Sequence, residues 1–302
     1  MTTTTSSTTQ RTRRIAIGSD ALVVDLYEPT LPTGELPVLL LHGWGGSGRY
    51  WAQTIARLRE RFPLIVPDLP GVGRSMPVRQ ARDMFGQMAA LETMCTELGL
   101  RRIHVVGHSM GGGITVLLAA KRPDLVERLV LTSIALFESN AQRQFFNRVV
   151  DSAAQMMRLR GVWMADVPGL VQQAARPFFT SVPNQPELLR AAFRDYLTMD
   201  RATAIASART ATSLEIPRAA AQIAAPTLLI VGRDDRYMPH ENVEGTVRLI
   251  PLAESRWMER CGHLPMVERP DEYASLLNEF LGNSGAHHQH GDGRALNDAN
   301  SG

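Results

Sequence analysis

The sequence predicts an α/β protein in which a mostly parallel β-sheet is covered by helices on both faces. Short apolar runs alternate with segments of helical spacing along most of the chain, and several runs are apolar without a break. Unbroken runs of this kind are typical of parallel strands buried on both faces. The alternation stops over residues 134–219 and then resumes. With 302 residues, 44% of them apolar, the chain can bury a sizeable core.

Two patterns identify the strands. Residues 21–29 (ALVVDLYEP) alternate apolar and polar side chains, as a half-exposed strand does, and residues 14–17 are placed to pair with them. Residues 37–43 (PVLLLHG) form a continuous apolar run that ends in glycine, which suits a strand buried on both faces. The predicted strands are 14–17, 21–29, 37–43, 63–69, 102–109, 126–133, 225–232 and 255–262.

Helical spacing and end signals identify the helices. Asp83 is a candidate N-cap for a segment that Gly99 ends, and Pro123 ends the helix that begins near residue 110. The last helix has Pro270 at its first position and Gly282 as its stop. The predicted helices outside residues 134–219 are 48–62, 83–99, 110–121, 241–249 and 270–282.

Composition divides the chain into a core, an inserted cap and two tails. Residues 1–12 and 283–302 lack the apolar content needed to fold, so we expect both to be disordered. Residues 134–219 are helical in composition and contain no clear buried strand. Because they lie between two strands, they should cover the carboxyl edge of the sheet, where ligands bind in such folds. The sequence therefore predicts a core of residues 13–133 and 220–282 with residues 134–219 as its cap.

Charge and composition exclude several function classes. A net charge of +2, without a dense Lys/Arg stripe, argues against a nucleic-acid partner. The sequence contains no membrane-length apolar run and no signal-peptide core, so we expect a cytoplasmic protein without integral membrane association. Cys95 and Cys261 lack metal-ligand spacing and are expected to be buried thiols. Three histidines of the C-terminal tail could bind a metal weakly, but a solvated tail is the favoured interpretation: His287, His288 and His290. We therefore predict neither a metal nor a cofactor.

The stretch VVGHSMGGG provides a candidate nucleophile. Its core, Gly107-His108-Ser109-Met110-Gly111, fits G-x-S-x-G, and it lies between a predicted strand and a predicted helix. In that setting the serine adopts a strained backbone conformation that exposes its Oγ, and the glycines let strand and helix approach closely. The alternative is a glycine-rich turn with an incidental serine.

A serine hydroxyl needs an adjacent base, and His263 is the best candidate. His263 follows a permissive glycine in a loop between the last strand and the last helix. His104 lies inside a strand, and the side chain of His108 is expected to point away from the base position. His240 begins a helix, and His42 is expected to make local hydrogen bonds.

An acid must orient the histidine and stabilise its cation. Asp234 and Asp235 both follow a buried strand, and the order Ser, Asp, His along the chain suits either of them. Asp68 comes before Ser109 and leads a tight turn, so a structural role is expected for it. Acyl transfer also needs oxyanion donors, for which the backbone N–H groups of Met110 and Trp44 are best placed.

These motifs together resemble the α/β-hydrolase superfamily over roughly residues 14–282. The pieces that carry the resemblance are HGWGG, PDLPGVGRS, GHSMGG, GRDD and GHLPMVERP. The resemblance implies Asp235 as the acid, supports Trp44 and Met110 as oxyanion donors, and implies a helical cap. Within this superfamily, Ser rather than Asp at position 109 disfavours the dehalogenase and epoxide-hydrolase branches.

The expected activity is hydrolysis of carboxylic esters of small to medium apolar substrates through an acyl-enzyme. Apolar cap residues suggest an acyl or alcohol pocket, unless they form the cap's own core: Phe145, Phe146, Met156, Met157, Trp163, Phe178 and Phe179. The alternative is a C–C bond hydrolase of ring-cleavage dienoates, with Arg176, Arg190 or Arg194 as a carboxylate site. Members of that subfamily usually carry Asn where this chain has His108 and Trp where it has Leu264. Lactonase, amidase, thioesterase and small-molecule receptor are further alternatives.

Overall fold

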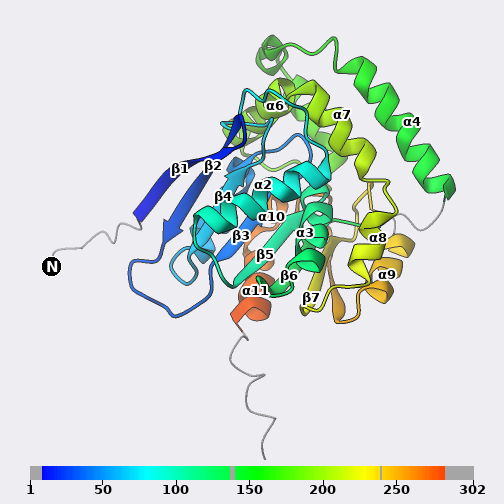
Figure 1. The fold of residues 1–302 in the computed structure, drawn as a ribbon. Coiled ribbons are helices and arrows are strands. Elements are labelled where there is room, and N and C mark those ends of the chain that lie inside the picture. Colours follow the sequence, from blue (N-terminus) through cyan, green and yellow to red (C-terminus); the bar gives the residue numbers. More distant parts are fainter. Residues whose placement is uncertain (1–8, 137–139, 239, 283–302) are drawn as a thin grey trace, which may run out of the picture.

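The computed structural model describes residues 9–136, 140–238 and 240–282. In this part of the chain eight strands form one sheet in the order β1-β2-β4-β3-β5-β6-β7-β8 (Figure 1). The strands β3 to β8 run parallel, whereas β1 and β2 form an antiparallel hairpin whose second strand pairs antiparallel with β4. The strands are β1 (Thr9–Ile17), β2 (Asp20–Glu28), β3 (Val38–Leu41), β4 (Leu64–Asp68), β5 (Ile103–His108), β6 (Val126–Thr132), β7 (Thr227–Gly232) and β8 (Ala253–Met258).

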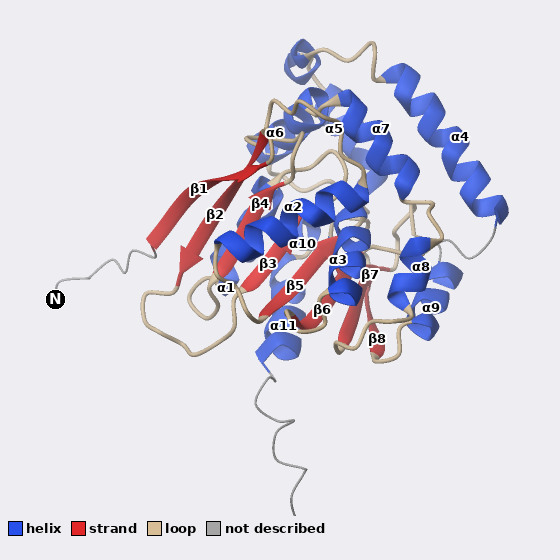
Figure 2. Cartoon of the chain, viewed as in Figure 1, coloured by secondary structure: helices blue, strands red, loops and turns tan. Residues whose placement is uncertain are grey.

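Helices cover both faces of this sheet, so the predicted α/β class is confirmed (Figure 2). Successive residues of the buried strands point to opposite faces: Val105 packs in one hydrophobic cluster and Val106 in the other. Residues of α2, α3, α8 and α9 belong to the first cluster, and residues of α1 and α11 to the second. These helices, with two short ones, are η1 (Gly48–Trp51), α1 (Ala52–Leu58), α2 (Met84–Glu97), α3 (Met110–Lys121), α8 (Glu215–Ala220), α9 (His240–Leu249), α10 (Pro265–Glu268) and α11 (Pro270–Gly282).

The predicted N-cap of α2 is confirmed. The Asp83 carboxylate accepts a hydrogen bond from the Gly86 N–H at 2.8 Å, which satisfies one of the unpaired donors of the first helical turn. Gly99, the predicted stop, has φ of +67°, a conformation that glycine adopts without steric cost. Local capping chemistry therefore fixes both ends of this helix.

The structure corrects the predicted boundaries at both ends of the sheet. Residues 9–12, which we expected to be disordered, belong to β1, because Thr9–Ile17 pair with β2 along their whole length. This strand lies at the edge, where backbone pairing does not require apolar side chains on both faces. Residues 1–8 and 283–302 lie outside the described residues. At the other edge, β8 ends at Met258 rather than near residue 262, and the short helix α10 was not predicted.

The described residues between 134 and 219 contain helices and no strand. Four of these helices lie together over one end of the sheet, above the strands in Figure 1, while α8 packs against α3 beside the sheet. The last residues of the segment thus join the layer that covers the sheet. The helices over the sheet, with two short turns, are α4 (Asn140–Met156), η2 (Val162–Asp166), α5 (Leu170–Ala175), η3 (Arg176–Phe178), α6 (Pro186–Thr198) and α7 (Arg201–Thr210).

Candidate active site

Ser109 occupies a strained turn between β5 and α3. Its backbone has φ of 52° and ψ of −122°, a conformation that residues with a side chain rarely adopt. A Cβ on Gly107 would lie 2.5 Å from Thr115 Oγ1, and one on Gly111 would lie 2.4 Å from the His42 carbonyl oxygen. The glycines of the motif are therefore required by the close approach of strand and helix.

Ser109, His263 and Asp235 come together at the ends of β5, β7 and β8. His263 Nε2 lies 3.2 Å from Ser109 Oγ, and His263 Nδ1 lies 2.8 Å from Asp235 Oδ2. Since an ionised carboxylate only accepts, Nδ1 carries the proton and Nε2 presents its lone pair to the serine hydroxyl. This arrangement is the one in which a histidine can remove the serine proton.

Asp235 is held as an anion by three hydrogen bonds. Burial raises the pKa of its carboxyl, but the bond from His263 and the backbone N–H groups of Tyr237 and Met238 outweigh burial, so that its pKa lies below the usual value. Asp234, the competing candidate, is exposed and accepts a hydrogen bond from Thr180 Oγ1 at 3.0 Å. Only Asp235 of this pair contacts the histidine.

Trp44 and Met110 both line the cavity in front of Ser109. Among the residues that the structure describes, neither backbone N–H donates a hydrogen bond to a protein acceptor. The two N–H groups therefore remain candidate donors to a substrate oxygen. Trp44 belongs to residues 42–48, which follow β3; they are called the oxyanion loop below because Trp44 is a candidate oxyanion donor.

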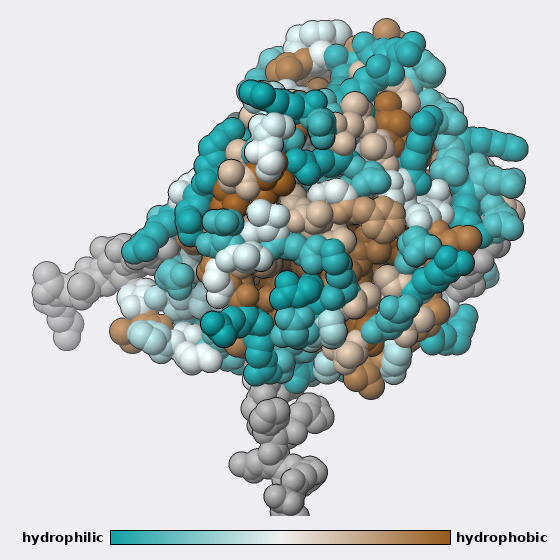
Figure 3. Space-filling view, viewed as in Figure 1, coloured by the Kyte–Doolittle hydropathy of each residue, from teal (hydrophilic) through white to brown (hydrophobic). Residues whose placement is uncertain are grey.

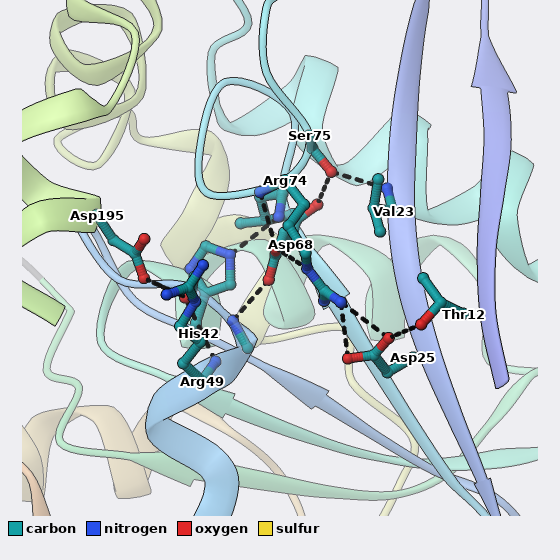
Figure 4. A network of polar contacts seen from close by, with 12 residues as sticks. Thr12, Val23, Asp25, His42, Arg49, Asp68, Arg74, Ser75 and Asp195 are labelled. Carbon is teal, nitrogen blue, oxygen red and sulfur yellow. Dashed lines mark hydrogen bonds and ion pairs between the residues drawn. The ribbon is translucent and has the colours of Figure 1, made fainter. Parts of the chain in front are cut away.

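Polar contacts connect the oxyanion loop to β4 and, through Arg74, to β2 and β1 (Figure 4). Asp68, which ends β4, accepts hydrogen bonds from the Gly48 N–H at 2.8 Å and from Arg74 Nε at 2.8 Å. Arg74 also binds Asp25 of β2 with two contacts of 2.9 Å, and Thr12 of β1 donates to the same carboxylate at 2.6 Å. The structural role predicted for Asp68 is confirmed, and Thr12, one of the residues that we expected to be disordered, takes part in this network.

Of the other histidines that the structure describes, one, His108, lies beside His263. His42 makes the predicted local hydrogen bond, to the Gly43 carbonyl at 2.9 Å, and it also accepts a hydrogen bond at 2.9 Å from the N–H of Leu69, 27 residues away. The prediction that His108 points away from the base is wrong. Its Nε2 lies 2.8 Å from the carbonyl oxygen of His263, and the two rings are 4.9 Å apart, because the loop after β8 runs alongside the end of β5.

A cavity of about 900 Å³ opens at Ser109 and His263, between the cap helices and the carboxyl edge of the sheet. Apolar side chains form most of its wall, and Arg236 is the one Arg, Lys, Asp or Glu side chain that lines it in the described residues. Figure 3 shows brown and tan residues between the cap and the core on one face, where the teal surface is interrupted. A cavity of this kind favours an apolar ligand.

The cap residues predicted to form a pocket divide into three groups. Phe146, Met157, Phe178 and Phe179 line the cavity, whereas Trp163 is 67% exposed and lies outside it. The side chains of Phe145 and Met156 lie outside the described residues. The predicted carboxylate-binding arginines do not line the cavity: Arg176, Arg190 and Arg194.

A sequence model of the alpha/beta hydrolase fold matches residues 37–270. This chain belongs to the α/β-hydrolase family. Lipase 1 of Psychrobacter immobilis is 32% identical over 256 residues, 81% of this chain and 76% of that protein. A 2-hydroxy-6-oxononadienedioate/2-hydroxy-6-oxononatrienedioate hydrolase of Cupriavidus pinatubonensis is 27% identical over 266 residues, 83% of this chain and 88% of that protein. A thermophilic esterase of Thermogutta terrifontis superposes with a TM-score of 0.72 at 25% identity, covering 91% of this chain and 99% of that one.

Two further findings concern membrane spans and metal sites in this α/β-hydrolase. In the residues that the structure describes, no helix combines the length and apolarity needed to span a bilayer. Within the same residues, no group of three or more His, Cys, Asp or Glu side chains is arranged to bind a metal ion.

The sequence analysis missed Tyr50, whose hydroxyl lies 3.1 Å from His108 Nδ1. Nothing in the motif around Ser109 indicates a contact with a residue 58 positions before His108.

Proposed function

We propose that this hydrolase cleaves carboxylic esters of small to medium apolar substrates through an acyl-enzyme on Ser109. The observation that carries the proposal is the 3.2 Å contact between Ser109 Oγ and His263 Nε2 at the floor of an apolar cavity. The similarity to a lipase and to an esterase structure supports the same reaction class.

Acylation begins when His263 accepts the Ser109 proton on Nε2 as Oγ attacks the ester carbonyl carbon. Asp235 stays ionised and stabilises the imidazolium, while the N–H groups of Trp44 and Met110 donate to the new oxyanion. Collapse of the tetrahedral intermediate breaks the bond to the alcohol oxygen. His263 returns its proton to that oxygen, and the alcohol leaves.

Deacylation repeats these steps with water. His263 removes a proton from a water molecule, whose oxygen attacks the acyl carbon, and the same two N–H groups stabilise the second oxyanion. The intermediate releases Ser109 Oγ, which recovers its proton from His263. One ester and one water thus give one acid and one alcohol, with no cofactor.

The cap supplies the specificity in this proposal. We assign residues 134–219 as the cap, although its last residues, in α8, pack against α3 of the core, and residues 13–133 and 220–282 as the core, because cavity-lining residues come from both parts. Each methylene that leaves water for an apolar wall contributes about 0.8 kcal/mol. The specificity constant should therefore rise about fourfold per methylene until the substrate fills the cavity.

C–C bond hydrolysis of dienoates is the second candidate, favoured by the dienedioate hydrolase among the relatives. A dienedioate presents carboxylates, which would need buried cations or several donors in the cavity. The wall offers Arg236 alone among the described Arg and Lys side chains, and this residue is exposed. Leu264 also stands where that subfamily usually has Trp. These features favour the ester reaction.

A series of p-nitrophenyl esters from acetate to laurate tests the proposal, with a ring-cleavage dienoate in parallel and Ser109→Ala as the control. The expected result is ester turnover that rises with acyl length, reaches a maximum and vanishes in the Ala variant. Faster turnover of the dienoate would favour the C–C reaction. Tight binding without turnover of any ester, lactone, amide or thioester would indicate a receptor.

A further inference from the structure

Tyr50 and His108 form a buried chain of contacts behind the proposed triad. The Gly43 N–H donates a hydrogen bond to the Tyr50 hydroxyl, and that hydroxyl lies 3.1 Å from His108 Nδ1. His108 Nε2 lies 2.8 Å from the carbonyl oxygen of His263. The side chains of Tyr50, His108 and His263 are all buried. This series of contacts therefore connects the oxyanion loop to His263.

The direction of each hydrogen bond follows from the chemistry of its ends. A carbonyl oxygen only accepts, so His108 Nε2 carries a hydrogen and donates a hydrogen bond to the backbone carbonyl oxygen of His263. In a neutral imidazole the other nitrogen is then an acceptor, so the Tyr50 O–H donates to Nδ1. The Tyr50 oxygen in turn accepts from the Gly43 N–H. Each atom in this series of contacts is therefore either a donor or an acceptor, without an alternative assignment.

The buried surroundings keep the two side chains in these protonation states. Burial, helped by the nearby His263, lowers the pKa of His108 to about 3, so the ring is neutral near pH 7. Burial raises the pKa of Tyr50 well above its usual value, so the phenol keeps its proton. The direction of each hydrogen bond in this series is thus fixed near pH 7.

Steric contact adds to these hydrogen bonds at the oxyanion loop. A Cβ on Gly43 would lie 2.8 Å from His108 Nδ1 and 3.2 Å from Ser109 Cβ, so the loop backbone is in contact with both side chains. Gly43 immediately precedes Trp44, the proposed oxyanion donor. A shift of the His108 ring would therefore displace the oxyanion loop and the loop that carries the base.

We propose that Tyr50 and His108 are positioning residues that set the distance between the oxyanion loop and His263. The inference rests on the proposed function, because it assigns a role relative to that triad. Neither residue takes part in proton transfer with the substrate. Their effect is on the geometry of the transition state, in which a misplacement of about 1 Å can cost about 100-fold in rate.

Three variants separate positioning from simple filling of space. His108→Gln places one amide near the position of Nε2 and keeps a donor for the His263 carbonyl, whereas His108→Asn reaches only the Tyr50 side. Tyr50→Phe removes a single oxygen atom. His104→Gln is the matched control, because His104 is a buried histidine on the same strand that does not line the cavity.

The measurements are kcat and KM with p-nitrophenyl butyrate, the rate of covalent labelling by a fluorophosphonate, and the melting temperature. We expect His108→Asn and Tyr50→Phe to lower kcat and the labelling rate by about 10- to 100-fold, with KM changed less than about threefold. His108→Gln should recover much of that loss. The kcat of the double variant His108→Asn/Tyr50→Phe should be little lower than that of the less active single variant, as expected of two residues that act through the same series of hydrogen bonds.

Several results would overturn the proposal. One is a kcat of His108→Asn and Tyr50→Phe within about twofold of the parent. Another is a loss no larger than that of His104→Gln at an equal fall in melting temperature. If His108→Asn does not fold, the kcat of Tyr50→Phe alone tests the positioning role. An active parent with unaffected variants contradicts this inference only, whereas a parent that neither hydrolyses esters nor reacts with the fluorophosphonate contradicts the proposed function as well.

Discussion

The hydroxyl of Ser47 in the oxyanion loop donates a hydrogen bond to the carboxylate of Asp195 in helix α6. Both residues are buried, and Arg49 adds an ion pair to the same carboxylate at 3.8 Å. Burial raises the pKa of Asp195, and the bond from Ser47 opposes that effect. Gly48 also donates a hydrogen bond to Asp68 at the end of β4. The oxyanion loop is therefore hydrogen-bonded both to the sheet, through Asp68, and to the cap helix α6, through Asp195.

Replacing Asp195 by Ala should therefore weaken catalysis as well as stability. The Ser47 hydroxyl would lose its buried partner, at a cost of about 1–3 kcal/mol in the free energy of unfolding, and kcat/KM for esters should fall about tenfold. Urea unfolding and ester kinetics measure the two effects. Asp166→Ala, which removes an exposed ion pair with Arg194, is the control and should change the stability by less than about 0.5 kcal/mol. Equal effects of the two variants would contradict the proposed tie.

The neighbouring aspartates Asp234 and Asp235 offer a matched test of the acid. In Asp235→Asn an amide replaces the group that accepts the His263 Nδ1–H, so the histidine loses its productive tautomer. We expect kcat to fall by about 10⁴ with little change in melting temperature. Asp234→Asn should stay within about threefold of the parent, since Asp234 is exposed and contacts Thr180 instead. The opposite ranking would reassign the acid.

Filling the cavity from α6 should shorten the preferred acyl chain. Ala192 lines the cavity, whereas its neighbour Ala191 does not. Ala192→Phe should move the optimum of the p-nitrophenyl series to shorter esters and lower kcat/KM for the longest by about 10-fold or more, because their last methylenes lose apolar contacts. Ala191→Phe should leave the optimum unchanged. A shift of the same size in both variants would argue against a role of this wall in specificity.

Acid should destabilise the fold from about pH 6.5 downward. Burial lowers the pKa of His42, of His104 to about 4 and of His108 to about 3, so between these values and 6.5 the unfolded chain binds more protons than the folded one. Stability therefore rises with pH in that window, by up to about 1.4 kcal/mol per pH unit for each histidine. Asp195 has the opposite effect on the pH dependence of stability: because its pKa is raised, its carboxyl binds a proton more readily in the folded chain than in the unfolded one.

Melting temperatures measured from pH 4 to pH 8 test this expectation. His104→Gln should have a flatter profile below about pH 6.5 than the parent, since one buried histidine no longer resists protonation. His240→Gln, at an exposed position, should reproduce the slope of the parent. A parent profile that is flat down to pH 4 would show that these histidines do not limit stability.

The core of the fold could be predicted because the signals that determine it are local. Residues 37–43 contain the strand β3, and the cap of α2 at Asp83 depends on a hydrogen bond that spans three residues. The turn at Ser109 was predictable for the same reason, since the glycines that its geometry requires lie within two residues of it.

Other features depend on contacts between distant parts of the chain and left no local pattern. The extent of β1 depends on pairing with β2 and on the contact of Thr12 with Asp25. The position of His108 depends on a loop 155 residues further along. The composition of the cavity wall could be predicted only in part, because helical spacing does not tell Phe146, which lines the cavity, from Trp163, which faces solvent.

The separation of Ser109 from its base along the chain also has a consequence for biosynthesis. His263 lies 154 residues after Ser109, with all the helices of the cap between them. A ribosome-bound chain that has not yet reached His263 has the serine but not the group that would activate it. On the proposed assignment, the nascent polypeptide remains inert toward esters until His263 has been synthesised, and by then all residues of the cap have been made.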